Sequence, residues 1–67
     1  MQTMNAEEKD ALKKRAVTML RAALKGGMDP KVLLRKCDME AEALGRYLGG
    51  ESFPPPNRAQ AIIDALK

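Results

Sequence analysis

The side chains that could carry chemistry in this chain are mostly cationic, because the usual catalytic and metal-binding residues are nearly absent. The 67 residues include no His and one Cys, Cys37, which excludes a His-dependent catalytic triad and the usual zinc sites. The glycine pairs at 26–27 and 49–50 have the pattern of helix stops and not of a phosphate-binding loop. We therefore expect no enzymatic activity, no metal ion, no cofactor and no small-molecule substrate.

Lysine and arginine are concentrated in one segment of the chain. Residues 9–36 carry nine basic and two acidic side chains, a net charge of +7, whereas the whole chain has a net charge of +3. Residues 1–8 carry two acidic side chains, and residues 37–67 carry three basic and five acidic ones. A basic segment of this kind favours an anionic partner, most simply nucleic acid. A solvated helix face would give the same pattern, and both interpretations stay open.

The composition predicts an all-α fold. Ala (10) and Leu (8) dominate the hydrophobic 45% of the chain, and only six residues are β-branched. A chain of this length forms one small domain with a modest core. The longest hydrophobic run is three residues, so we expect no transmembrane helix and a cytoplasmic protein. Cys37 has no partner for an internal disulfide, which fits a reducing compartment.

Capping residues indicate where three of the predicted helices begin. Asn5 and Asn57 are each followed three residues later by Glu or Gln, the pattern of a capping box. Asp29 before Pro30 places a favoured N-cap residue ahead of a proline at the first helical position. A third helix is expected between the second helix and the glycines at 49–50.

Apolar residues recur at helical spacing in each predicted helix. The expected helices run from Asn5 to the glycines at 26–27, from Asp29 to about Cys37, from about Glu40 to Leu48, and over 57–67. Between the last two, residues 51–56 form a loop that three prolines stiffen, and Phe53 is expected to fold back over the last helix. The apolar positions of the four helices are Leu12, Ala16, Met19, Leu20, Ala23 and Leu24; Val32, Leu33, Leu34 and Cys37; Leu44, Tyr47 and Leu48; and Ala59, Ile62, Ile63 and Leu66.

The stretch from Gly27 to Leu66 resembles the lambda-repressor-like DNA-binding domains of the phage repressor and Cro type. Two short helices joined by about three residues form a helix-turn-helix pattern. The segment Leu44-Gly45-Arg46-Tyr47-Leu48-Gly49-Gly50-Glu51 looks like the end of that family's recognition helix and the loop that follows. The segment Pro54-Pro55-Pro56-Asn57-Arg58-Ala59-Gln60-Ala61-Ile62-Ile63-Asp64-Ala65-Leu66 is similar to its proline-containing turn and next helix.

The resemblance covers roughly residues 16–67. It implies one small four-helix domain over 1–67, with the helix-turn-helix at about 29–50 and an extended basic first helix. Asp38 stands where the family's tight turn usually has glycine, and Asp tolerates left-handed backbone geometry better than most residues.

The resemblance also implies which residues would contact DNA. Residues at the start of the recognition helix would read base edges in the major groove, and residues of the neighbouring helices would bind phosphates. By position, the base contacts would be Ala41, Glu42 and Arg46, and the phosphate contacts would be Lys31, Arg35, Asn57 and Arg58.

The function that the resemblance implies is sequence-specific regulation of transcription. The protein would be a repressor that binds an inverted-repeat operator as a homodimer, of the phage, prophage or anti-defence operon type. The alternative is a protein-interaction module on a repressor-like fold with little or no specific DNA binding. Glu40 and Glu42 favour this alternative because carboxylates repel phosphate, and Pro30 favours it because proline has no N–H to donate.

Overall fold

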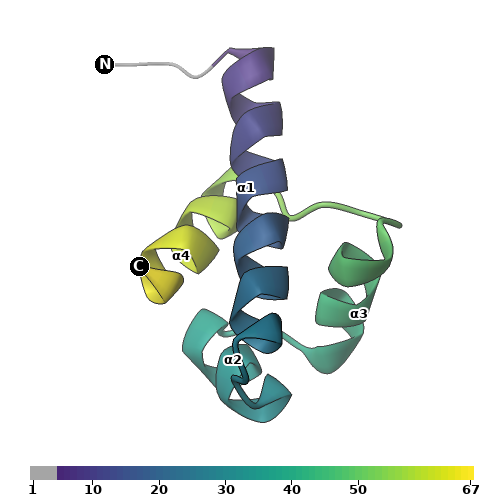
Figure 1. Ribbon diagram of the computed structural model, residues 1–67. Coiled ribbons are helices and arrows are strands. Elements are labelled where there is room, and N and C mark those ends of the chain that lie inside the picture. The colour runs from purple at the N-terminus through teal and green to yellow at the C-terminus, as the bar shows by residue number, and fades with distance from the viewer. Residues whose placement is uncertain (1–4) are drawn as a thin grey trace.

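Over residues 5–67, the part of the chain that the computed structural model describes, the fold contains four α-helices and no strand (Figure 1). The predicted all-α class with four helices is therefore confirmed. In Figure 1, α1 is the longest helix, α4 lies beside its middle, and α2 and α3 lie toward its C-terminal end. The helices are α1 (Ala6–Lys25), α2 (Pro30–Cys37), α3 (Ala41–Gly49) and α4 (Pro56–Leu66).

Side-chain caps begin α1 and α2 as predicted. Asn5 Oδ1 accepts a hydrogen bond from the backbone N–H of Glu8 at 2.8 Å, which caps α1. Asp29 Oδ1 accepts from the N–H of Lys31 at 2.9 Å, with Pro30 in the first turn of α2. Each cap satisfies a backbone donor that has no partner within its helix.

The predicted capping box at Asn57 is wrong. Helix α4 begins at Pro56, its N-cap residue is Pro55, and no side chain caps it. Proline suits the first helical position because its φ is already helical and its missing N–H would have no helical partner there. Gln60 Nε2 instead donates to Asp64 Oδ1 at 3.0 Å within the helix.

Three residues with left-handed backbone end the first three helices. Gly27 (φ 101°) follows α1, Asp38 (φ 51°) follows α2 and Gly50 (φ 79°) follows α3. Beyond Gly50, the N–H of Glu51 donates to the carbonyl of Arg46 at 3.0 Å and closes the end of α3. The glycine stops and the turn at Asp38 therefore lie where the sequence predicts them.

The core forms mainly where α1 packs against α4, which is the most extensive contact between two helices. All the predicted apolar positions except Val32 are buried or packed half-buried against this core. Val32 is 52% exposed, because Leu33 and Cys37 turn the buried side of α2 away from it. Val17 is also buried, although its sequence position did not single it out. The residues buried most completely are Ala16 and Leu20 of α1, Leu33 of α2, and Ala59 and Ile62 of α4, all with no measurable exposure.

Phe53 does not fold back over α4 as predicted. Its side chain is 45% exposed and lines a shallow hollow with Tyr47 and the α1 residues Lys14, Val17, Thr18 and Arg21. The next residue, Pro54, is fully buried. The loop therefore inserts Pro54, and not Phe53, into the core. None of the helices within residues 5–67 is long and apolar enough to cross a membrane.

Cys37 is a buried thiol at the end of α2, as predicted. It is 4% exposed, and burial raises the pKa of the thiol, an effect that the neighbouring Lys36 charge partly offsets. A raised pKa leaves less thiolate at pH 8, and thiolate is the reactive form. We expect a maleimide or disulfide reagent to label the folded protein much more slowly than the same protein in denaturant. Equal labelling rates in the two conditions would contradict the burial of Cys37.

Candidate nucleic-acid interface

The predicted base-contact residues of helix α3 are all exposed. Glu42 and Arg46 lie one turn apart on the side away from Leu44, which is only 6% exposed and joins the core. Ala41, one turn before Leu44, is exposed at the first position of the helix. Burial of Leu44 fixes the rotation of the helix about its axis, because apolar and polar positions separate at helical spacing. The structure therefore leaves the three predicted base-contact residues open to solvent and brings Glu42 and Arg46 together.

An ion pair links Glu42 and Arg46 on this surface. Arg46 Nη2 lies 2.6 Å from Glu42 Oε1. The side chain of Arg46 is 57% exposed and that of Glu42 is 72% exposed. The residues are four positions apart, so their side chains meet one turn along the helix. An exposed pair of this kind contributes about 0–1 kcal/mol. The guanidinium of Arg46 or the carboxylate of Glu42 can therefore change to another hydrogen-bonding partner at little cost in free energy.

Lys31 and Arg35, the predicted phosphate contacts of α2, are exposed and lie one turn apart on the same side of the helix. The backbone N–H of Lys31 already donates to Asp29, so this amide is not free to bind phosphate. A phosphate contact of Lys31 therefore depends on its side chain. The side chains of Lys31 and Arg35 provide the positive charge of this surface.

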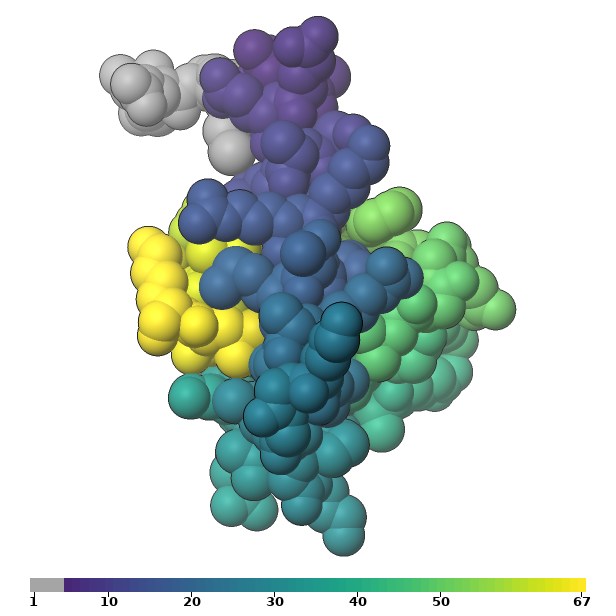
Figure 2. Space-filling view, viewed as in Figure 1, coloured from purple at the N-terminus to yellow at the C-terminus, as the bar shows by residue number. Residues whose placement is uncertain are grey.

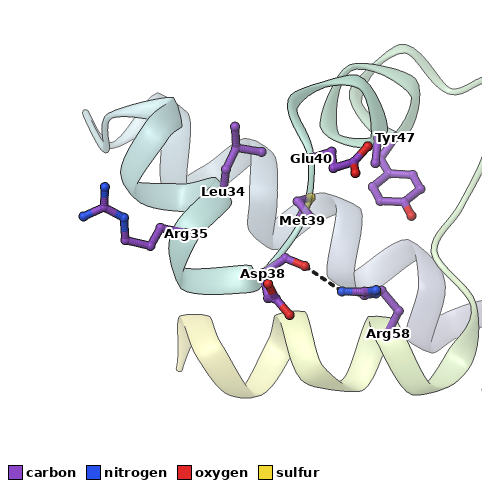
Figure 3. A pocket seen from close by; sticks show the side chains of 8 residues that line it. Leu34, Arg35, Asp38, Met39, Glu40, Tyr47 and Arg58 are labelled. Carbon is purple, nitrogen blue, oxygen red and sulfur yellow. Dashed lines mark hydrogen bonds between the residues drawn. The ribbon is translucent and has the colours of Figure 1, made fainter.

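Arg58 has a structural role that the sequence did not reveal. Its Nη1 donates to the backbone carbonyl of Asp38 at 2.7 Å, which ties α4 to the turn between α2 and α3 (Figure 3). The bond lies in an open hollow of about 570 Å³ lined by residues of α2, the turn, α3 and α4. Arg35 also lines this hollow, but in Figure 3 its guanidinium points away from Arg58. The two arginines therefore do not form one anion site.

Two more residues bear on this surface, one by holding α3 in place and one as a predicted phosphate contact. Arg21 Nη2 of α1 donates to the backbone carbonyl of Leu48 at 2.8 Å and so holds the C-terminal end of α3. A cation there is favourable because the carbonyls at a helix C-terminus carry partial negative charge. Asn57, the fourth predicted phosphate contact, is exposed in the first turn of α4.

Comparisons of the chain with protein-family models, with curated proteins and with solved structures found no match. The likeness to lambda-repressor-like domains is carried by the residues quoted above and stays a prediction.

The chemistry available at this surface is hydrogen bonding and charge. Arg46 offers a planar fork of donors, Glu42 offers two acceptor oxygens, and Ala41 offers a methyl group. These are the group types that can distinguish base pairs in the major groove of DNA. Within residues 5–67, no three Cys, Asp or Glu side chains gather closely enough to hold a metal ion.

Proposed function

We propose that the protein is a sequence-specific DNA-binding regulator that acts as a repressor and binds an inverted-repeat operator as a homodimer. The observation that carries the proposal is the exposure of Ala41, Glu42 and Arg46 on α3, which follows α2 after a three-residue turn. Two short helices with this connection suit a helix-turn-helix, whose second helix enters the major groove.

In the proposed complex, α3 reads base edges. Arg46 donates from its two terminal nitrogens to O6 and N7 of a guanine, the commonest specific contact of this kind. Glu42 accepts from the N4 amine of a cytosine, and the methyl group of Ala41 contacts that of a thymine. In the free protein, Glu42 holds the guanidinium of Arg46 on the exposed side of α3.

Phosphate contacts then set the register of the protein on the duplex. The side chains of Lys31 and Arg35 on α2 and of Asn57 and Arg58 on α4 provide them. Arg58 uses one of its five N–H donors for Asp38 and keeps the others for phosphate. Two protomers related by a two-fold axis would place two α3 helices in successive major grooves, about 34 Å apart. Occupancy of the promoter would exclude the polymerase.

The salt dependence of binding tests this proposal. Three of the four phosphate contacts are cationic, Lys31, Arg35 and Arg58, so a dimer neutralises six phosphates, which predicts a slope of log affinity against log salt of roughly −5. Affinity should then fall by about 10³-fold between 50 and 200 mM salt. The duplex is obtained by selection from a randomised pool, and its binding is measured by fluorescence anisotropy at several salt concentrations. A flat salt dependence, or a pool with no enriched inverted repeat, would contradict the proposal.

A second candidate function is a protein-interaction module with the same helices. The observation that favours it is the exposed aromatic side chain of Phe53, 45% exposed beside α1. The exposed carboxylates Glu40 and Glu42 also weaken attraction to phosphate on α3. Absence of binding to any duplex at low salt would favour this function, and a pull-down comparing the chain with its Phe53→Ala variant would then seek the partner.

A further inference from the structure

The first turns of α1 stand clear of the other helices. Figure 1 shows its first turns above α4, and in Figure 2 the same part, coloured purple, projects from the body of the molecule. The buried residues of α1 are Ala16, Val17 and Leu20, all in its C-terminal half. Residues 6–11 are all exposed. Among residues 5–67, no other helix therefore covers the side chains of residues 6–11.

Four side chains form a stripe along the N-terminal half of α1. Glu8, Ala11, Leu12 and Arg15 line one shallow hollow on the surface of α1. They lie at positions i, i+3, i+4 and i+7, the spacing by which one helix contacts another. The centre of the stripe is apolar, its N-terminal end is acidic and its C-terminal end is basic. Leu12 packs half-buried against the core and keeps part of its side chain at the surface, whereas the other three are exposed. We name these four residues the α1 stripe.

We propose that the α1 stripe is the contact between two copies of this chain, whose α1 helices pair antiparallel about a two-fold axis between positions 11 and 12. The proposal rests on the proposed function in one respect, that the regulator binds as a homodimer, and it identifies the surface. The axis places Ala11 against the partner's Leu12. It also places Glu8 against the partner's Arg15, at both ends of the contact.

The order of charges on the stripe favours a second copy over any other occupant. An antiparallel copy matches each acidic end with a basic end, and a parallel copy would place Glu8 beside the partner's Glu8. Glu8 and Arg15 take part in none of the ion pairs found among residues 5–67, so both charges are available. The neighbouring Lys14 is paired with Asp10 at 3.0 Å on another side of the helix. Ala11 is small, which lets two helices approach closely.

The size of the stripe sets the expected strength. Two apolar side chains and two charged ones per protomer make a contact at the low end of specific interfaces. We expect a reversible monomer–dimer equilibrium that is half complete at a concentration on the order of 100 µM in low salt. Operator DNA would strengthen this pairing, because both half-sites hold the protomers close together.

Sedimentation equilibrium of the full chain without DNA tests the proposal. Glu8→Arg and Arg15→Glu each place like charges opposite each other at both ends of the contact, so each should weaken dimerisation by at least about tenfold. The double variant Glu8→Arg/Arg15→Glu restores opposite charges and should restore dimerisation. The matched control is Asp10→Arg/Lys14→Glu, which swaps a neighbouring pair on another side of α1 and should leave dimerisation unchanged. Circular dichroism of each variant checks that it is folded.

The outcomes separate this inference from the proposed function. A wild-type chain that is monomeric up to 1 mM would overturn the inference, as would single variants that dimerise normally or a double variant that is not restored. If selection on DNA still recovers an operator in that case, the regulator function stands and another surface pairs the protomers. If the charge-swap pattern appears but no DNA is enriched, the dimer contact stands and the proposed function fails.

Discussion

Replacing Leu20 with alanine is expected to remove most of the stability of this domain. Leu20 has no measurable exposure and belongs to the core cluster that joins α1 to the other helices. Leu→Ala substitutions at such positions cost about 2–5 kcal/mol, from lost burial and from the cavity that remains. A single core in a domain of this size rarely supplies more than about 3–5 kcal/mol. Urea denaturation followed by circular dichroism at 222 nm measures the loss.

The matched control is Val32→Ala on α2. Val32 is 52% exposed, so its truncation opens no cavity and should change the free energy of unfolding by no more than about 0.5 kcal/mol. Both variants are measured at a low concentration at which the chain is monomeric, so that association does not add to stability. If the two substitutions had similar costs, the core would not be centred between α1 and α4.

Helix boundaries and most of the core could be predicted because their causes are local in the sequence. Asp29 caps the start of α2 by accepting from an N–H two residues later, and Pro30 occupies the first helical position. Gly50 ends α3 because glycine readily adopts a left-handed backbone. Spacing of apolar residues identified the buried sides of the helices. The exception at α4 was also local, since a proline at the first helical position outweighed the side-chain cap expected at Asn57.

Contacts between distant residues could not be predicted from the sequence. Arg21 binds the carbonyl of Leu48, 27 residues away, and Arg58 binds that of Asp38, 20 residues away. An arginine that binds a distant carbonyl has the same local sequence signal as one that binds phosphate. The spacing of the α1 stripe is visible in the sequence. Its exposure could not be predicted, because exposure depends on where the other helices pack. The residues predicted to contact DNA lie at the surface of the fold, and their roles can be tested only with the partner bound.

Replacing Arg46 with alanine is expected to weaken binding to the selected operator by about 1–3 kcal/mol per half-site, or about 5- to 150-fold. It should also relax the preference at one base pair of each half-site, because the guanine contact is lost. The cost of releasing Arg46 from Glu42 is small, since both side chains are exposed. Anisotropy titrations on the selected operator, on operators changed at single base pairs and on a random duplex measure both effects.

Two variants separate base reading from simple charge. Arg46→Lys keeps the positive charge but not the planar fork, so it should lose discrimination at the same base pair while retaining its affinity for the random duplex. Glu42→Gln removes a negative charge and should strengthen binding to all duplexes, with altered preference at one position if Glu42 reads a cytosine. An equal loss on the operator and the random duplex after Arg46→Ala would instead place Arg46 at a phosphate. The sequence reader on α3 would then have to be sought at another residue.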